Sequence, residues 1–187
     1  SVAEGAYKEV IKNSLTKEKI ENAHVHLLKI SRILGDHRSA ERKIKSMLVD
    51  EKFKNIKGEL ELELVQLYLA QKDTDNAMVR LESIIKDYQR TKTSSEAYYL
   101  MGQINLSGIW KPDLAKEKFS QVKKEYNRSE YGPIAESKVK AIDAYNESLI
   151  SLKIYDSIKS DTLLTDTTSS DSINNKVDKI VKSYEEL

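Results

Sequence analysis

The sequence predicts an all-α fold, an α-α superhelix built from antiparallel helix pairs. The first observation behind this prediction is a small residue followed at +4 and +7 by larger apolar residues. This signature occurs four times, as Ala3/Tyr7/Val10, Ala40/Ile44/Met47, Ala77/Leu81/Ile84 and Ala115/Phe119/Val122. The alanines at positions 3, 40, 77 and 115 are 37, 37 and 38 residues apart. The spacing puts each trio on one helical face, and its regular return indicates a stacked helical repeat.

The second observation is the helical spacing of apolar residues between the signatures. Helices are predicted over residues 2–14, 17–34, 58–71, 76–88, 94–107, 113–126 and 133–155. Residues 58–65 alternate like a strand, but Tyr68 and Leu69 continue the pattern at helical spacing, so a helix is predicted there too.

The third observation is the chemistry of the turns between helices. Gly35 and Asp36 combine a helix C-terminal glycine with a candidate N-cap. Residues 72–75 form a second turn, and Pro112 suits the first turn of the helix that follows it. Each short turn joins two helices into an antiparallel pair.

The chain is predicted to have three parts. Residues 1–157 form the repeat array, which starts inside a repeat because residues 2–14 read as a second helix without its first. Further repeat or another helix is therefore expected upstream. Residues 158–172 are rich in Ser, Thr and Asp and are predicted to be a flexible linker. Residues 173–187 have apolar residues at helical spacing and are predicted to form a short C-terminal helix.

Composition excludes several classes of protein. Basic and acidic residues nearly cancel, at a net charge of +1, which argues against a dedicated nucleic-acid or membrane-surface protein. The chain has no cysteine, so it has no disulfide, thiolate nucleophile or Cys-ligated zinc. It also lacks a run of about eighteen apolar residues, so no direct membrane span is expected.

The repeat units resemble tetratricopeptide (TPR) repeats. The matching positions in the third unit are Met101, Gly102, Ala115, Phe119 and Val122, with Asn127 where the family usually has Pro. Those in the second unit are Leu64, Val65, Tyr68, Ala77, Leu81 and Ile84, and those in the first are Leu27, Leu28, Ala40, Ile44 and Met47. The first unit departs from the family pattern by placing Ser31 where an aromatic residue is usual.

The connections between units are longer than the family period of about 34 residues requires. Residues 88–97 and 126–135 resemble the Tyr-Pro-x-Ser-x-Tyr-Ala-x-x-Ala connection of bacterial envelope repeat proteins. The similar families are the periplasmic Tol-Pal accessory proteins and the lipoproteins of the outer-membrane β-barrel assembly machine. This resemblance implies a periplasmic or outer-membrane-associated protein that acts in envelope assembly.

In such arrays the first helices of the pairs line a concave groove. The family register places three groups of residues in it: Val25, Lys29, Arg32 and Ile33; Leu62, Gln66 and Leu69; and Tyr99, Gln103 and Leu106. Apolar and amide groups beside a basic end suit an extended or helical peptide. The alternative is that these side chains pack between helices or face water. Because Val25, Leu62 and Tyr99 replace the polar residues that grip a C-terminal carboxylate in chaperone-binding members, no such clamp is expected.

The other candidate functional residues, namely the histidines, a group of glutamates and the tryptophan, are expected to have structural or solvent-facing roles. His24 and His26 point in different directions on a helix, and His37 lies in a turn, so no metal site is expected. Glu59, Glu61 and Glu63 are expected to form a solvated helix start. Trp110 could anchor a partner, but we expect it to fold back over the helix ends.

The sequence as a whole predicts a non-catalytic scaffold or adaptor that needs no cofactor or metal. Its expected partner is a protein or peptide, not nucleic acid. Two alternatives remain: a cytosolic adaptor, and an accessory or regulatory domain of a larger protein or enzyme.

Overall fold

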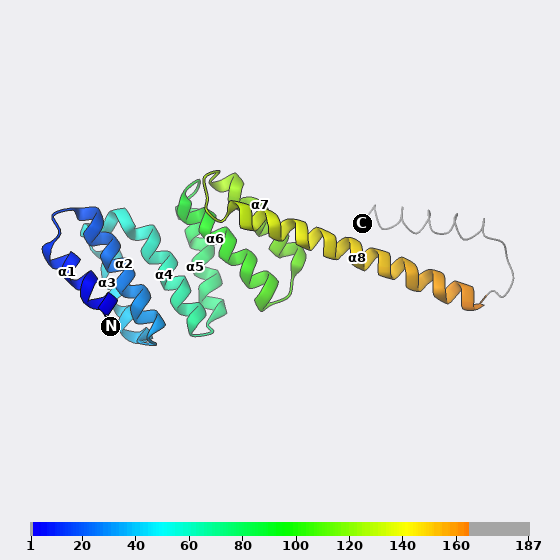
Figure 1. Ribbon diagram of the computed structural model, residues 1–187, viewed down its shortest axis with the longest axis horizontal. Helices are drawn as coiled ribbons and strands as arrows, with labels where there is room; N and C mark the ends of the chain where they lie inside the picture. Colours follow the sequence, from blue (N-terminus) through cyan, green and yellow to red (C-terminus); the bar gives the residue numbers. More distant parts are fainter. Residues whose placement is uncertain (1, 165–187) are drawn as a thin grey trace. The chain divides into compact units, whose positions relative to one another are not determined.

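The computed structural model describes residues 2–164, with side chains through residue 159. These residues form eight α-helices and no strand (Figure 1). The α-helices are α1 (Val2–Asn13), α2 (Lys17–Ile33), α3 (His37–Val49), α4 (Lys57–Ala70), α5 (Thr74–Asp87), α6 (Lys92–Gln103), α7 (Pro112–Glu125) and α8 (Gly132–Leu164). The predicted all-α class is confirmed. The chain divides into two compact units, Ser1–Glu136 and Ser137–Leu187, and the first contains α1 to α7.

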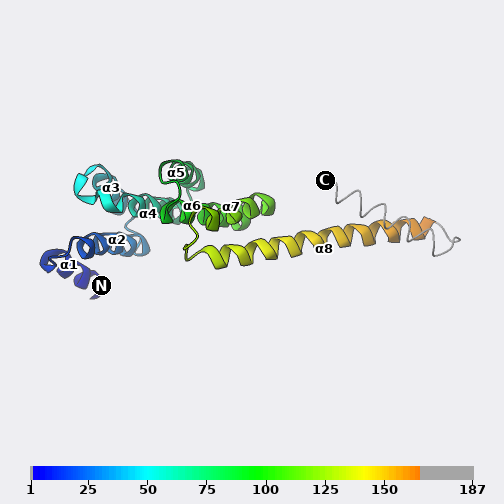
Figure 2. The same cartoon turned by 90° about the horizontal axis from the view of Figure 1, so that it is seen from above.

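Within the first unit, each helix packs against the next one in the chain. Short turns join α2 to α3, α4 to α5 and α6 to α7, so the members of each pair run in opposite directions. The first members of the pairs also touch one another, α2 with α4 and α4 with α6. In Figure 2, α2 lies below α3 and α4 lies below α5. Three parallel helices, α2, α4 and α6, therefore form a row of neighbours.

The turns explain where the helices begin and end. Gly35 has a φ of 81°, the left-handed conformation that lets a glycine end α2. The Asp73 carboxylate accepts a hydrogen bond from the backbone N–H of Asn76 at 3.2 Å and caps α5. Pro112 is the first residue of α7. Asp36 occupies the N-cap position of α3, as predicted, but its carboxylate makes no capping hydrogen bond.

The recurrent signature forms the interior of the first unit. Its members in α3, α5 and α7 are all buried: Ala40, Ile44, Met47, Ala77, Leu81, Ile84, Ala115, Phe119 and Val122. A Cβ added at Gly102 would lie 2.5 Å from Phe119 Cε1, so Gly102 gives this ring its space. The signature in α1, Ala3/Tyr7/Val10, differs from these three, because α1 has no buried residue and Ala3 is exposed. The small residues allow close approach, and the large ones fill the volume between helices.

Six of the helices from α1 to α7 had predicted bounds, and all but one of these start and end within two residues of them. The seventh, α3, contains the predicted Ala40, Ile44 and Met47. The predicted helix over 94–107 ends at Gln103 and continues as a π-helical turn, Ile104–Gly108. A short 3₁₀ helix, Glu51–Ile56, also precedes α4.

The last described helix is longer than predicted. α8 continues through Leu164, so residues 158–164 of the expected linker are helical. This stretch contains Ser, Asp and Thr but neither Gly nor Pro, and those polar residues cost a helix less than about 0.7 kcal/mol each. The rest of that linker and the expected helix over 173–187 lie outside the described residues.

Candidate functional site

The row of parallel helices carries a hollow, which we call the basin. Its volume is about 290 Å³, just below the roughly 300–1,000 Å³ typical of ligand pockets. Residues from α2, α4 and α6 and from the segment after α7 line it: Val25, Lys29, Arg32, Glu59, Leu62, Glu63, Gln66, Glu96 and Tyr131. The basin thus exists because α4 lies between α2 and α6.

A buried ion pair joins two walls of the basin. Arg32 Nε on α2 donates to Glu63 Oε1 on α4 at 2.6 Å. The side chain of Glu63 is 3% exposed and that of Arg32 is 22% exposed, so water screens the pair poorly. An arginine has five N–H donors, and this bond uses the single one on Nε. The described residues supply no other acceptor for Arg32, so its terminal nitrogens are available to a ligand.

Two further polar side chains of the basin are not engaged within the described part of the chain. Lys29 lies one helical turn before Arg32 and is exposed. Gln66 lies on α4, on the same side as Glu63, and is half-buried. Neither side chain makes a hydrogen bond or an ion pair with a described residue. An ammonium and an amide with unused donors can therefore meet a ligand without breaking an internal contact.

The α6 side of the basin is held by aromatic and carboxyl groups. Tyr131 Oη donates to Glu96 Oε1 at 3.2 Å. The Tyr131 ring stacks on Tyr99 with centroids 4.6 Å apart, and Tyr99 also contacts Phe119 at 5.8 Å between centroids. Burial raises the pKa of Glu96, an effect that the hydrogen bond from Tyr131 and the charge of Lys92 partly oppose. Burial and the neighbouring Glu96 carboxylate raise the pKa of Tyr131.

The floor of the basin is apolar. Val25 is 8% exposed and Leu62 is 6% exposed, and both belong to the packed interior of the first unit. The basin therefore combines an apolar floor with charged and amide groups on its walls. That combination can bind a peptide segment, with apolar area giving affinity and polar groups giving orientation.

The structure brings together five of the ten residues predicted to face a partner: Val25, Lys29, Arg32, Leu62 and Gln66. Leu69 and Gln103 line a second hollow instead. Tyr99 stands behind the basin wall through its stacking on Tyr131, and Leu106 lines neither hollow. Ile33, which the family register also pointed to, is 75% exposed at the end of α2.

The second hollow lies where α4 ends, α5 begins and α6 passes into its π-helical turn. Its volume is about 550 Å³. Its lining is Leu69, Thr74, Asp75, Leu100, Gln103, Ile104, Ser107, Gly108 and Ile109. No charged pair crosses it among the described residues, so it offers apolar area with little to orient a ligand.

Sequence reasoning missed the acidic half of the basin. Glu63 was expected in a solvated helix start, and this expectation is wrong because α4 packs against α2, α3, α5 and α6 at once. Glu61 is also partly buried, pairs with Arg80 at 3.3 Å, and has a pKa raised by burial. Glu59 is exposed, as expected. A signal was available in the sequence, since a glutamate among Leu60, Leu62, Leu64 and Val65 cannot escape burial if the helix is central.

Trp110 and the three histidines do not line the basin. Trp110 is 60% exposed, so the expectation that it folds back over the helix ends is wrong. Its φ of 53° lies in the left-handed region, which is uncommon for a residue with a side chain. His26 stacks on Tyr7 with centroids 4.8 Å apart, and His24 meets the Phe53 ring edge-on at 5.1 Å. Burial and Lys43 lower the pKa of His24.

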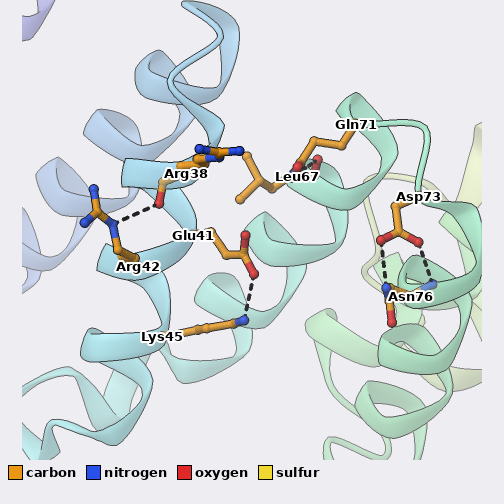
Figure 3. Close-up of polar contacts among 8 residues, drawn as sticks. All are labelled: Arg38, Glu41, Arg42, Lys45, Leu67, Gln71, Asp73 and Asn76. Carbon is orange, nitrogen blue, oxygen red and sulfur yellow. Dashed lines mark hydrogen bonds and ion pairs between the residues drawn. The ribbon is translucent and has the colours of Figure 1, made fainter.

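A second group of charges lies on the outer face of α3, formed by Arg38, Glu41, Arg42 and Lys45 around a shallow depression. Figure 3 shows that Lys45 Nζ meets Glu41 Oε1, at 2.6 Å, and that Arg42 Nε donates to the Arg38 carbonyl, at 3.4 Å. Both contacts connect residues four apart on one helix. Arg38, Arg42 and Lys45 are exposed and Glu41 is half-buried, and among the described residues none of the four bonds to another helix. This face lacks the fully buried carboxylate that distinguishes the basin.

Metal sites and membrane spans are the remaining features to consider in residues 2–164. No group of three or more His, Asp or Glu side chains is placed to hold a metal ion within this range. None of its helices is long and apolar enough to cross a membrane. Comparison with protein-family models, curated proteins and solved structures finds no match for this chain.

Proposed function

We propose that this protein is a non-catalytic interaction scaffold whose basin binds a segment of a partner protein. The observation that carries the proposal is the meeting of three helices from different pairs around one hollow. Val25 and Leu62 supply an apolar floor, while Lys29, Gln66 and the terminal nitrogens of Arg32 have donors to spare. A preformed hollow of this kind avoids much of the ordering cost of binding.

The charged groups of the basin favour recognition over catalysis. Glu63 is committed to Arg32, and Glu96 accepts a hydrogen bond from Tyr131. Each contact joins two segments and fixes the shape of a wall. These carboxylates therefore hold the site open for a ligand, which is the role the proposal assigns to them.

The repeat class and the cellular setting are part of the same proposal. The 37- and 38-residue spacing of the signature and the connections at 88–97 and 126–135 support a tetratricopeptide-type array of the bacterial envelope. We propose a periplasmic or outer-membrane-associated adaptor in envelope assembly. Fractionation of the source cells tests this setting, because recovery in the cytosol would favour the cytosolic adaptor or the accessory domain instead.

The binding function can be tested with a library of random linear peptides displayed on phage. Gln66→Trp fills the basin from a half-buried position whose side chain makes no bond within the described residues. Glu82→Trp places the same large side chain on an exposed position of α5 and serves as the matched control. The parent and Glu82→Trp are expected to enrich the same peptides, and Gln66→Trp is expected to lose them. Absence of enrichment on the parent, or enrichment that survives Gln66→Trp, would contradict the proposal.

A further inference from the structure

The charges of the basin are arranged along the helices in a definite order. Because α2, α4 and α6 are parallel, their first turns lie toward one end of the basin and their last turns toward the other. Glu59 is in the first turn of α4, and Glu96 is in the first half of α6. Arg32 is in the last turn of α2, with Lys29 one turn before it. The end of the basin at Glu59 and Glu96 is therefore acidic and the end at Arg32 is cationic, and the charge of Lys29 on α2 also reaches Glu96.

The cationic end is prepared for a carboxylate. Glu63 fixes the guanidinium of Arg32 through Nε at 2.6 Å and leaves both terminal nitrogens without an acceptor from the described residues. A guanidinium held in this way can donate two parallel hydrogen bonds to one carboxylate. Lys29 adds a second positive charge beside it and forms no ion pair with a described residue.

The acidic end is prepared for a cation. Glu59 forms no ion pair with a described residue, and Glu96 receives one hydrogen bond, from a neutral tyrosine. Burial raises the pKa of Glu96, which means that its ionised form lacks full solvation or a close positive partner. An incoming ammonium or guanidinium would supply that partner. The positive charges of Lys29 and Lys92 act on Glu96 but do not pair with it directly.

We propose that the partner segment is dipolar: an acidic side chain binds at Arg32 and Lys29, a basic side chain binds at Glu59 and Glu96, and an apolar side chain between them covers Val25 and Leu62. This inference rests on the proposed function and adds the chemistry of the partner to it. Charge complementarity at both ends selects the orientation of the segment, since a reversed peptide meets like charges at each end.

The test uses the peptides that the phage selection enriches. One of them is synthesised with its charges intact, with its acidic residue changed to the amide, and with its basic residue changed to glutamine. Each is titrated by calorimetry into the parent and two variants. Lys29→Gln, Arg32→Gln and Glu63→Gln together remove every charge of the cationic end and keep a hydrogen-bonding pair at positions 32 and 63. Glu59→Gln with Glu96→Gln neutralises the acidic end and keeps an acceptor for Tyr131.

The parent protein is expected to bind each neutralised peptide at least about tenfold more weakly than the charged peptide. The reason is that one hydrogen bond to a charged group contributes enough free energy to change an affinity by about that factor. The Lys29→Gln/Arg32→Gln/Glu63→Gln variant is expected to bind the acidic peptide and its amide form equally well, and still to lose affinity when the basic residue is replaced. The other variant is expected to show the opposite. Glu41→Gln with Arg42→Gln, which removes one charge of each sign from the outer face of α3, is expected to behave like the parent.

Two results separate the failure of this inference from the failure of the proposed function. Peptides that depend on the basin but carry no acidic and basic pair, or that respond equally in all variants, would overturn the dipolar partner and leave the scaffold intact. Peptides that bind independently of Gln66→Trp would overturn both.

Discussion

The basin and the outer face of α3 contain the same kinds of charged side chains in different surroundings. In the basin, Arg32 pairs with Glu63 between two helices, and Glu63 is 3% exposed. On α3, Lys45 pairs with Glu41 at the same distance of 2.6 Å, yet Lys45 is 56% exposed and both residues belong to one helix. The comparison teaches that distance alone does not measure an ion pair. Burial and the number of helices joined decide whether a charge shapes the fold or remains solvated.

The largest expected difference is in stability. Arg32→Ala leaves the buried Glu63 carboxylate without a partner, and this is expected to lower the free energy of unfolding by about 3 kcal/mol. Arg42→Ala on α3 is the matched control and is expected to change it by less than about 0.5 kcal/mol. Urea denaturation followed by circular dichroism measures both. Equal effects would show that the basin pair is as solvated as the α3 face.

The double variant sharpens the first prediction. Arg32→Gln with Glu63→Gln removes both charges and keeps two groups able to bond to each other. It is expected to recover most of the stability that Arg32→Ala loses, because no buried charge remains unpaired. If the double variant were as unstable as Arg32→Ala, the loss would come from side-chain packing and not from charge.

Salt provides a smaller test. The Glu41–Lys45 pair is expected to contribute about 0.3–0.5 kcal/mol, as exposed pairs four residues apart on a helix do. In about 1 M salt that contribution is expected to vanish, because the screening length falls to about 3 Å. The coupling between Arg32 and Glu63, measured by a double-mutant cycle in low and high salt, is expected to change little. If the coupling energy between Arg32 and Glu63 disappeared in high salt, the pair would be exposed to solvent, and the account of a buried pair would be wrong.

The smallest expected effect concerns pH. Burial raises the pKa of Glu96 above its usual value, so the folded state binds this proton more tightly than the unfolded state does. The contribution of Glu96 to stability is therefore lost as pH rises from the unfolded pKa through the folded one. Glu96→Gln is expected to remove this decline and to be slightly stabilising at neutral pH. Unfolding curves from about pH 4 to pH 8 measure the slope, and an unchanged slope would mean that Glu96 is well solvated.

Much of the fold could be predicted from the sequence because it depends on local periodicity. Ala40, Ile44 and Met47 share a helical face, and a face that recurs three times must pack against something. The same reasoning predicted part of the lining of the basin, since Val25 and Leu62 occupy equivalent positions in successive helix pairs. Its cationic wall at Lys29 and Arg32 followed from the register of α2.

The acidic wall could not be predicted in the same way. Glu63 and Glu96 enter the basin because α4 lies between two parallel neighbours, and Tyr131 arrives from a segment beyond α7. Their contacts span 31 and 35 residues, from Arg32 to Glu63 and from Glu96 to Tyr131. Periodicity within one helix carries no information about such pairs. The sequence likewise does not specify the left-handed backbone of Trp110 or its exposure.

The central claim, that the basin and not another surface receives a partner segment, is tested most directly by NMR titration of the labelled protein with an enriched peptide. The methyl groups of Val25 and Leu62 and the side-chain amide of Gln66 are expected to shift together and to saturate with the affinity measured by calorimetry. The resonances of Arg42 and Lys45 on α3 are expected to stay in place. Shifts confined to α3 or to the second hollow, with Val25, Leu62 and Gln66 unmoved, would contradict the account.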